Sequence, residues 1–197
     1  MSIIGITGLK RSGKDTISEL LTKEYGYVRY SFADPLKKAT KEIFGFTDEQ
    51  LWGNEKEVID KDWGISAREV LQILGTEMLQ FDIHNHTDKL KHIGRNIWVE
   101  RFKIWYNQEI IKNPDLKVVV PDVRFNHEVN VIKQLGGTMW KVVRPSLNNK
   151  DLHLSETEIE SIEVDLILEN TSTIEELYNL IKNKHIQNIY SDYGKTI

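Results

Sequence analysis

The chain has 197 residues, a net charge of −4 and no cysteine. Its length fits one domain that can bury a core without disulfide or metal staples. The lack of cysteine excludes thiol catalysis, thiolate metal sites and disulfides, and the negative charge excludes a global basic surface for duplex nucleic acid.

Apolar periods typical of strands and helices alternate along the first half of the chain. Residues 47–64 are charged and lack such a period, which predicts an irregular segment. Ser66 and Glu69 have the spacing of a capping box and indicate where a helix begins. The expected elements of this half are a strand at 3–7, a helix at 14–24, a strand at 27–32, and helices at 35–44, 66–81 and 96–111.

The second half continues the alternation. The β-branched run 118–120, bounded by Pro121, is typical of a strand buried on both faces. The expected elements here are a strand at 118–120, a helix ending at 135, strands at 138–143 and 164–168, and a helix at 173–184. This order predicts an α/β fold of three layers, with a central parallel sheet that binds its ligand at the carboxyl ends of the strands.

Residues 8–14 match the phosphate-loop pattern G-x-x-x-x-G-K between the first strand and the first helix. Glycines let successive backbone N–H groups turn toward a phosphate, and the helix N-terminus adds positive partial charge. A chance Gly-rich turn is the alternative. The predicted ATP-binding residues are Lys10, Arg11, Ser12, Gly13, Lys14, Asp15 and Thr16.

Asp15 stands where the common pattern has Ser or Thr, and Thr16 follows it. We expect the Thr16 hydroxyl to face Mg²⁺. Asp15 either acts on the metal through water or favours the helix N-terminus.

Asp122 ends the strand at 118–120, where P-loop proteins place an acid that orients magnesium or its water. A turn residue at a strand end is the alternative. Arg124 follows two residues later and suits a phosphorylated substrate. We therefore predict catalytic roles for Asp122 and Arg124.

Polar and small residues share one face of the helix at 66–81. If this face binds a ligand, the arginine can hold a phosphate with two N–H groups, the glutamine can hydrogen-bond the edge of a base, and the glycine lets the ligand come close. An ordinary solvent-exposed face is the alternative. The face consists of Arg68, Gln72, Gly75 and Thr76. Beside it, an apolar stripe expected to pack on the core consists of Leu71, Leu74 and Met78.

Two further sequence features bear on the predicted site. Trp98 and Phe102 are an i,i+4 aromatic pair that packs in the core or stacks on a base. Residues 145–162 form a long polar loop that predicts a water-excluding lid, with an ordinary exposed loop as the alternative. Arg144 is the candidate lid arginine, and the loop also carries His153, Ser155 and Glu156.

Taken in order, these motifs resemble the deoxynucleoside monophosphate kinases of tailed bacteriophages. The resemblance rests on G-x-K-R-S-G-K-D-T, R-x-x-x-Q-x-L-G-T and P-D-x-R-x-x-H-E at 8–16, 68–76 and 121–128, with V-R-P at 143–145 and H-x-S-E at 153–156. It implies a P-loop fold like that of nucleoside monophosphate kinases, with a substrate-binding insertion at about 33–115 and the lid. The implied acceptor site consists of Arg68, Gln72, Gly75, Thr76, Trp98, Asp122, Arg124 and Glu128, with 32–37 beside it.

The expected activity is ATP-dependent phosphorylation of a deoxynucleoside monophosphate, in which Lys14, Mg²⁺, Arg124 and Arg144 neutralise the developing charge. One rival is a kinase of another phosphorylated metabolite, of the phosphomevalonate or dephospho-coenzyme A type. The other is a nucleotide-dependent switch or DNA-binding ATPase, against which the sequence lacks N-K-x-D and a basic face.

The expected partner is a small molecule, with no duplex nucleic acid and no membrane. No window approaches the roughly 20 apolar residues of a membrane span, and the apolar run at 1–6 is too short for a secretory signal. We expect a cytoplasmic location, that of the host if a phage encodes the chain. A homodimer is compatible with the sequence, in which nothing defines the oligomeric state.

Overall fold

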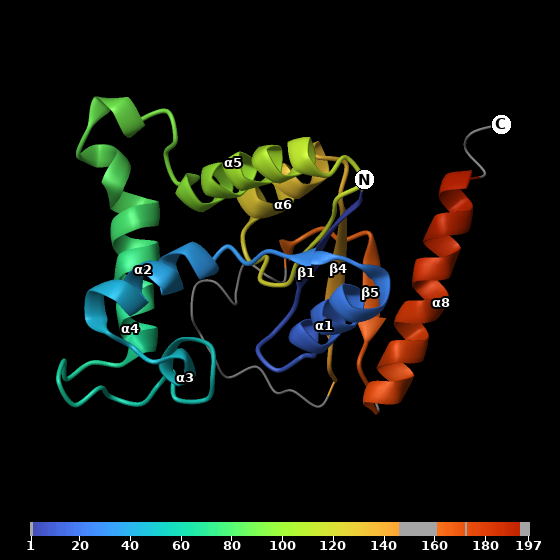
Figure 1. Cartoon of the computed structure of the whole chain (residues 1–197), viewed down its shortest axis with the longest axis horizontal. Coiled ribbons are helices and arrows are strands. Elements are labelled where there is room, and N and C mark those ends of the chain that lie inside the picture. The colour runs from blue at the N-terminus through green and yellow to red at the C-terminus, as the bar shows by residue number, and fades with distance from the viewer. Residues whose placement is uncertain (1, 146–160, 172, 194–197) are drawn as a thin grey trace. The chain divides into compact units, whose positions relative to one another are not determined.

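The computed structural model describes residues 2–145, 161–171 and 173–193 (Figure 1). The chain divides into two compact units. Unit 1 comprises Met1–Tyr30 and Lys112–Ile197, and unit 2 comprises Ser31–Ile111. Unit 2 overlaps most of the segment 33–115, for which a substrate-binding role stays a prediction.

Unit 1 contains a five-stranded parallel sheet in the order β2-β3-β1-β4-β5. The first strand lies in the middle, with Ile3 opposite Val118 on one side and Ile4 opposite Thr138 on the other. The strands are β1 (Ser2–Thr7), β2 (Val28–Arg29), β3 (Lys117–Val120), β4 (Thr138–Val143) and β5 (Leu166–Glu169).

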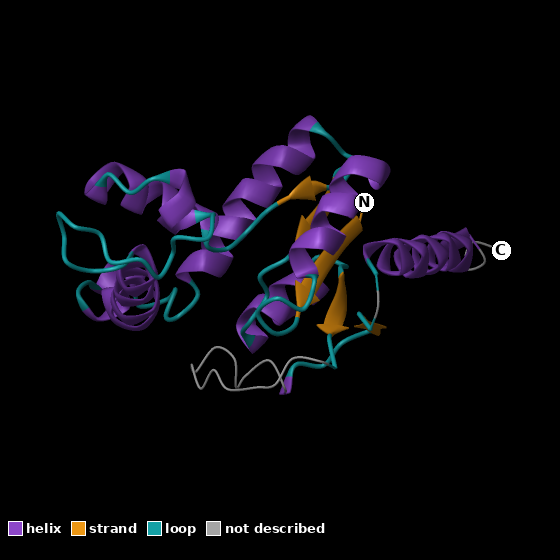
Figure 2. Cartoon of the chain, turned by 90° about the horizontal axis from the view of Figure 1, so that it is seen from below, coloured by secondary structure: helices purple, strands orange, loops and turns teal. Residues whose placement is uncertain are grey.

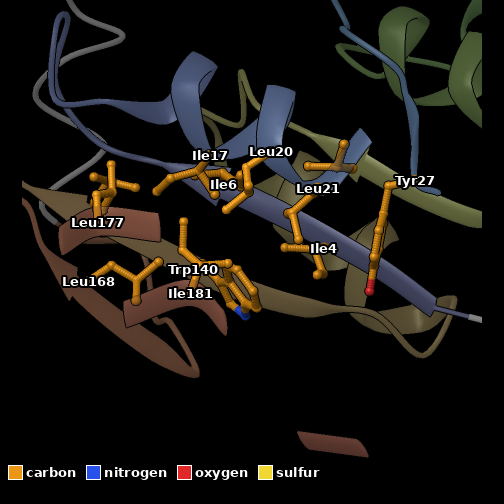
Figure 3. Packing of buried hydrophobic residues seen from close by; sticks show 12 residues of the cluster. Ile4, Ile6, Ile17, Leu20, Leu21, Tyr27, Trp140, Leu168, Leu177 and Ile181 are labelled. Atoms are coloured by element: carbon orange, nitrogen blue, oxygen red, sulfur yellow. The ribbon is translucent and has the colours of Figure 1, made fainter. Parts of the chain in front are cut away.

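Helices cover both faces of this sheet (Figure 2). On one face, α1 (Lys14–Tyr25) and α8 (Ile174–Tyr193) pack on the even-numbered side chains of β1. Figure 3 shows this core, with Ile17 of α1, Leu177 of α8 and Trp140 of β4 around Ile6. On the other face lies α6 (Asn126–Gln134), whose Ile132 side chain comes so close to Gly5 that a Cβ there would contact it at 2.7 Å. The predicted three-layer α/β fold is therefore confirmed.

Unit 2 is helical and has its own small core. Phe46, Leu51, Ala67 and Val70 are buried together, with Leu71 and Leu74 packed against them. The helices of unit 2 are α2 (Asp34–Phe44), α3 (Asp48–Leu51), α4 (Ala67–Gln72), the π-helix η1 (Ile73–Asp82), the 3₁₀ turns η2 (Ile83–Asn85) and η3 (Asp88–Leu90), and α5 (Ile97–Lys112).

Most expected elements are present, and unit 2 shows the main differences. Residues 47–64 are not wholly irregular, because Thr47 and Gln50 form a capping box that starts the four-residue helix α3. The helix at 66–81 begins at the predicted Ser66–Glu69 capping box but is π-helical from Ile73 onward. A π-helix pairs i with i+5, so its wider turn moves later side chains off the expected face. Met78, expected in the core, is 52% exposed.

Two elements of unit 1 also differ in length. The strand expected at 27–32 pairs only over Val28–Arg29, although Tyr30 N still donates to Val119 O at 3.0 Å. The last helix extends well beyond residue 184. In the part of the chain that the structure describes, no helix has the length and apolar character needed to cross a membrane.

Candidate active site

The phosphate-loop motif lies between β1 and α1, as predicted. Its backbone turns through positive φ values at Gly8, Arg11 and Gly13, and Gly13 is the N-cap of α1. Side chains would not fit at either glycine, because a Cβ at Gly8 would collide with the Val142 carbonyl and one at Gly13 would lie 2.7 Å from Asn170 Nδ2. The loop is therefore a backbone cradle pressed against the ends of β4 and β5.

The ammonium group of Lys14 lies against the backbone of the phosphate loop. Its Nζ donates to the carbonyl oxygens of Gly8 and Leu9, both at 2.7 Å. An ammonium group held over the loop by its own backbone can stabilise phosphate bound to the loop N–H groups.

The two predicted metal-side residues lie in the first turn of α1. Thr16 is partly buried, whereas Asp15 is exposed and accepts a hydrogen bond from Arg29 Nη2 at 3.0 Å. Asp15 thus links α1 to β2. Arg29 escaped the sequence analysis because nothing in the sequence relates the edge strand to the loop.

A cavity of about 360 Å³ opens at the loop. Its lining brings Arg144, which follows β4, together with the predicted ATP-binding residues. Three further residues come from the segment after β5 and from α8, and the sequence analysis did not single them out. The complete lining is Arg11, Gly13, Lys14, Asp15, Thr16, Arg144, Asn170, Ile174 and Leu177. The position of Asn170 at the carboxyl end of a predicted strand was the one signal that could have drawn attention to it.

The turn after β3 lies beside the end of β1. Val123 N donates to Ile6 O at 3.2 Å, which places Asp122 and Arg124 at the same edge of the sheet as the phosphate loop. Both side chains are partly buried. The structure therefore brings Asp122 and Arg124 to the carboxyl end of the sheet.

Glu128 serves the start of α6. Its carboxylate is buried and accepts the backbone N–H groups of Arg124 at 2.7 Å and Phe125 at 3.1 Å. Burial is the main cause that raises the pKa of the Glu128 carboxyl to about 8; the Arg124 N–H opposes this shift and the nearby charge of Asp122 adds to it. The observed contacts of Glu128 are with the main chain, and its acceptor-site role stays a prediction.

The remaining predicted acceptor residues lie in unit 2. Arg68 and Gln72 are on α4, where the Arg68 Nε lies 3.9 Å from a Glu57 carboxylate oxygen. Thr76 is on the π-helix and is partly buried. The acceptor-site role of these three residues stays a prediction.

Gly75 and Trp98 contact each other, since Trp98 Nε1 donates to Gly75 O at 3.1 Å. A Cβ at Gly75 would collide with Leu36 of α2. The glycine thus allows η1 to approach α2 within unit 2, a packing reason that the sequence analysis did not consider. Phe102, in contrast, is completely buried and stacks on Trp105, as the core interpretation of the aromatic pair predicts.

The predicted lid lies almost entirely outside the described residues. His153, Ser155 and Glu156 are among the residues not described, whereas Arg144 and Pro145 at its start are exposed. The lid at 145–162 stays a prediction.

Comparisons with known proteins identify the family of this chain. The family model for deoxynucleotide monophosphate kinase matches residues 2–54 and 46–181. A putative deoxynucleotide monophosphate kinase of Acanthamoeba polyphaga mimivirus is 43% identical over 185 residues, covering 92% of this chain and 94% of that protein. The deoxynucleotide monophosphate kinase of Enterobacteria phage T4 is 28% identical over 237 residues, covering 93% and 98%.

Among solved structures, a dephospho-CoA kinase from Campylobacter jejuni superposes with a TM-score of 0.50 at 19% identity, covering 98% of this chain and all of that one. At this identity the likeness shows the P-loop kinase fold alone. Because the family model spans most of the chain and a relative exceeds 40% identity over nearly its whole length, the chain belongs to the deoxynucleotide monophosphate kinase family.

Proposed function

We propose that this chain transfers the γ-phosphoryl group of ATP to the phosphate of a deoxynucleoside monophosphate, with Mg²⁺ as its metal cofactor. Membership of the family supports a phosphotransferase that uses a nucleotide donor. The observation that carries the proposal is the cavity at the phosphate loop, where Lys14, Arg11 and Arg144 line one space with the N-terminus of α1.

The loop fits a donor triphosphate. Its glycines adopt positive φ values that allow backbone N–H groups to turn toward phosphate oxygens, and the start of α1 adds positive partial charge. Ile174 and Leu177 give the cavity an apolar side suited to a base. Bound ATP supplies the phosphoryl group, and Mg²⁺ supplies positive charge that neutralises the phosphate oxygens.

Oxygen ligands for the metal are present beside Lys14. Magnesium accepts hydroxyl and carboxylate oxygens directly or through water, so Thr16 and Asp15 can hold it together with the phosphates. Asp15 would exchange its contact with Arg29 for this role. Asp122 at the end of β3 can orient the metal or its water, as acids at this position do in P-loop proteins.

Arginines provide the remaining charge stabilisation. Arg124 lies after β3 and Arg144 after β4, both at the carboxyl edge of the sheet. A guanidinium group can bind two phosphate oxygens at once, which stabilises the charge that develops during transfer. No covalent enzyme intermediate is needed, because positioning supplies most of the acceleration.

For the nucleoside part of the acceptor we propose residues of unit 2. Arg68 offers a planar fork for phosphate, and Gln72 can bind the edge of a base. The Thr76 hydroxyl suits a sugar or base oxygen.

A coupled assay that offers each deoxynucleoside and ribonucleoside monophosphate with ATP and Mg²⁺ tests the proposal. We expect ADP to form with at least one deoxynucleotide, faster than with its ribonucleotide. Inert nucleotides together with turnover of phosphomevalonate or dephospho-coenzyme A would replace the proposal by the metabolite-kinase rival. ATPase activity that appears only with DNA would favour the switch or DNA-binding ATPase.

A further inference from the structure

Asn170 lies directly after β5 and is buried at the loop cavity. Its Nδ2 donates a hydrogen bond of 2.8 Å to the carbonyl oxygen of Ser12, 158 positions away in the sequence. The same Nδ2 occupies the space that a Cβ of Gly13 would need. The side chain of Asn170 and the Ser12–Gly13 peptide are therefore fitted to each other.

The contact with Asn170 determines where the N–H group of the Ser12–Gly13 peptide points. All peptide bonds in the described residues are trans, and in a trans peptide the C=O and N–H groups point in opposite directions. Holding the Ser12 carbonyl toward Asn170 thus turns the Gly13 N–H away from β5. In a phosphate loop this N–H is one of the donors that can face a phosphate.

The backbone of Asn170 reaches a second part of the cavity. Its N–H donates to Val143 O at 2.7 Å, and Val143 is the last residue of β4, directly before Arg144. Arg144 lines the cavity with Lys14. One residue at the end of β5 therefore ties the phosphate loop to the strand end that carries the arginine.

We propose that Asn170 is a positioning residue that holds the Ser12–Gly13 peptide in the orientation that binds the phosphates of the donor nucleotide. This inference rests on the proposed function, because it requires that the loop binds a polyphosphate. It gives Asn170 no direct contact with the base. A role in binding the base is the competing explanation, since Asn170 also lines the cavity beside Ile174.

The test compares two ligands by isothermal titration calorimetry, ATP and inorganic tripolyphosphate, each with Mg²⁺. Asn170→Ala removes the donor and leaves the Ser12 carbonyl unpaired in a buried place, so we expect Kd for both ligands to rise on the order of tenfold. A rise for ATP with no change for tripolyphosphate would show a base contact and overturn the inference.

Asn170→Asp keeps the shape of the side chain and makes its hydrogen bond to the Ser12 carbonyl depend on pH. An ionised carboxylate cannot donate to the Ser12 carbonyl, whereas a protonated one can. Burial raises the pKa of such a carboxyl, so protonation falls in an accessible range. We expect the Kd for tripolyphosphate, divided by that of the wild type at the same pH, to fall from about pH 8 to about pH 5.5. A constant ratio would contradict the inference.

Leu168→Val is the matched control. Leu168 lies on the same strand and is buried in the core, so the change lowers the melting temperature without removing a hydrogen bond to the loop. Its Kd for tripolyphosphate should equal that of the wild type, and a rise like that of Asn170→Ala would reduce the role of Asn170 to general stability. If the wild type binds neither ligand, the proposed function fails; if the wild type binds both and Asn170→Ala binds them equally well, only the inference fails.

Discussion

The phosphate loop of unit 1 and the α4–η1 segment of unit 2 hold their predicted site residues in different ways. In the loop, the backbone itself is the predicted binding element, and it is held by contacts with the ends of β4 and β5. In α4–η1 the predicted binding groups are side chains, and the helix that bears them changes from α to π at Ile73. The loop thus tolerates little change in main-chain geometry, whereas the predicted role of the α4–η1 segment depends on the direction of each side chain.

The largest effect should come from Lys14→Ala, which tests the loop directly. Removing a charge that stabilises the transition state costs on the order of 3–4 kcal/mol, so kcat should fall by hundreds-fold. The melting temperature should stay near that of the wild type, because Lys14 is only partly buried and hydrogen-bonds loop carbonyls outside the apolar core. Lys23→Ala, an exposed change on the same helix, is the control and should keep normal kinetics. Retention of more than half of kcat by Lys14→Ala would refute the phosphate-loop assignment.

Arg124→Lys should show the next largest effect. A lysine cannot reproduce bidentate contact with phosphate, so kcat/KM should fall by roughly 10- to 100-fold, the equivalent of about 1.5–3 kcal/mol. Stability should change little, because the observed contact of Arg124 with Glu128 uses the backbone N–H, which lysine retains. Steady-state kinetics and thermal melting of this variant distinguish a catalytic role of Arg124 from a structural one. Lower stability with normal activity would mean that Arg124 holds the turn after β3 together.

Glu128 holds the turn beside the phosphate loop, and the pH dependence of the unfolding free energy tests its contribution. Its folded pKa of about 8 lies above the ordinary value of 4.5, so the folded state binds the extra proton between these values. Stability from this group is therefore complete below about pH 4.5 and is lost as pH rises toward 8. Denaturant unfolding across this range should show a decrease in the wild type that exceeds that of Glu128→Gln by up to about 1.4 kcal/mol for each pH unit. Equal pH dependence in the two proteins would mean that Glu128 is ionised throughout.

The smallest expected effect tests the packing of η1. Gly75→Ala introduces a Cβ against the flexible end of Leu36 and should lower the unfolding free energy by about 1 kcal/mol. In a double-mutant cycle, Leu36→Ala should remove this cost, because the colliding atoms are then absent. Thermal or denaturant melting of the three variants measures the coupling. Additive effects would show that Gly75 is needed for another reason.

Motifs whose function lies in the backbone were predictable from the sequence. The strand, the glycines and Lys14 of residues 3–14 follow one another locally, and the Ser66–Glu69 capping box likewise needs only neighbours along the chain. The β-branched run at β3 indicated burial on both faces, which places Asp122 and Arg124 at a sheet edge. Local sequence is sufficient here because local hydrogen bonds and steric limits determine the geometry.

Tertiary structure alone decided the contacts between distant segments. Asn170 against Ser12, Arg29 against Asp15 and Gly75 against Leu36 join residues that share no local pattern. The π-helix that begins at Ile73 was likewise not predicted, because its residues are as apolar as those of an ordinary α-helix. The sequence thus determined the fold class and the phosphate loop. Long-range packing determined how that loop is held and where the side chains of unit 2 point. Such packing depends on the complementary shapes of distant segments, which a local sequence pattern does not contain.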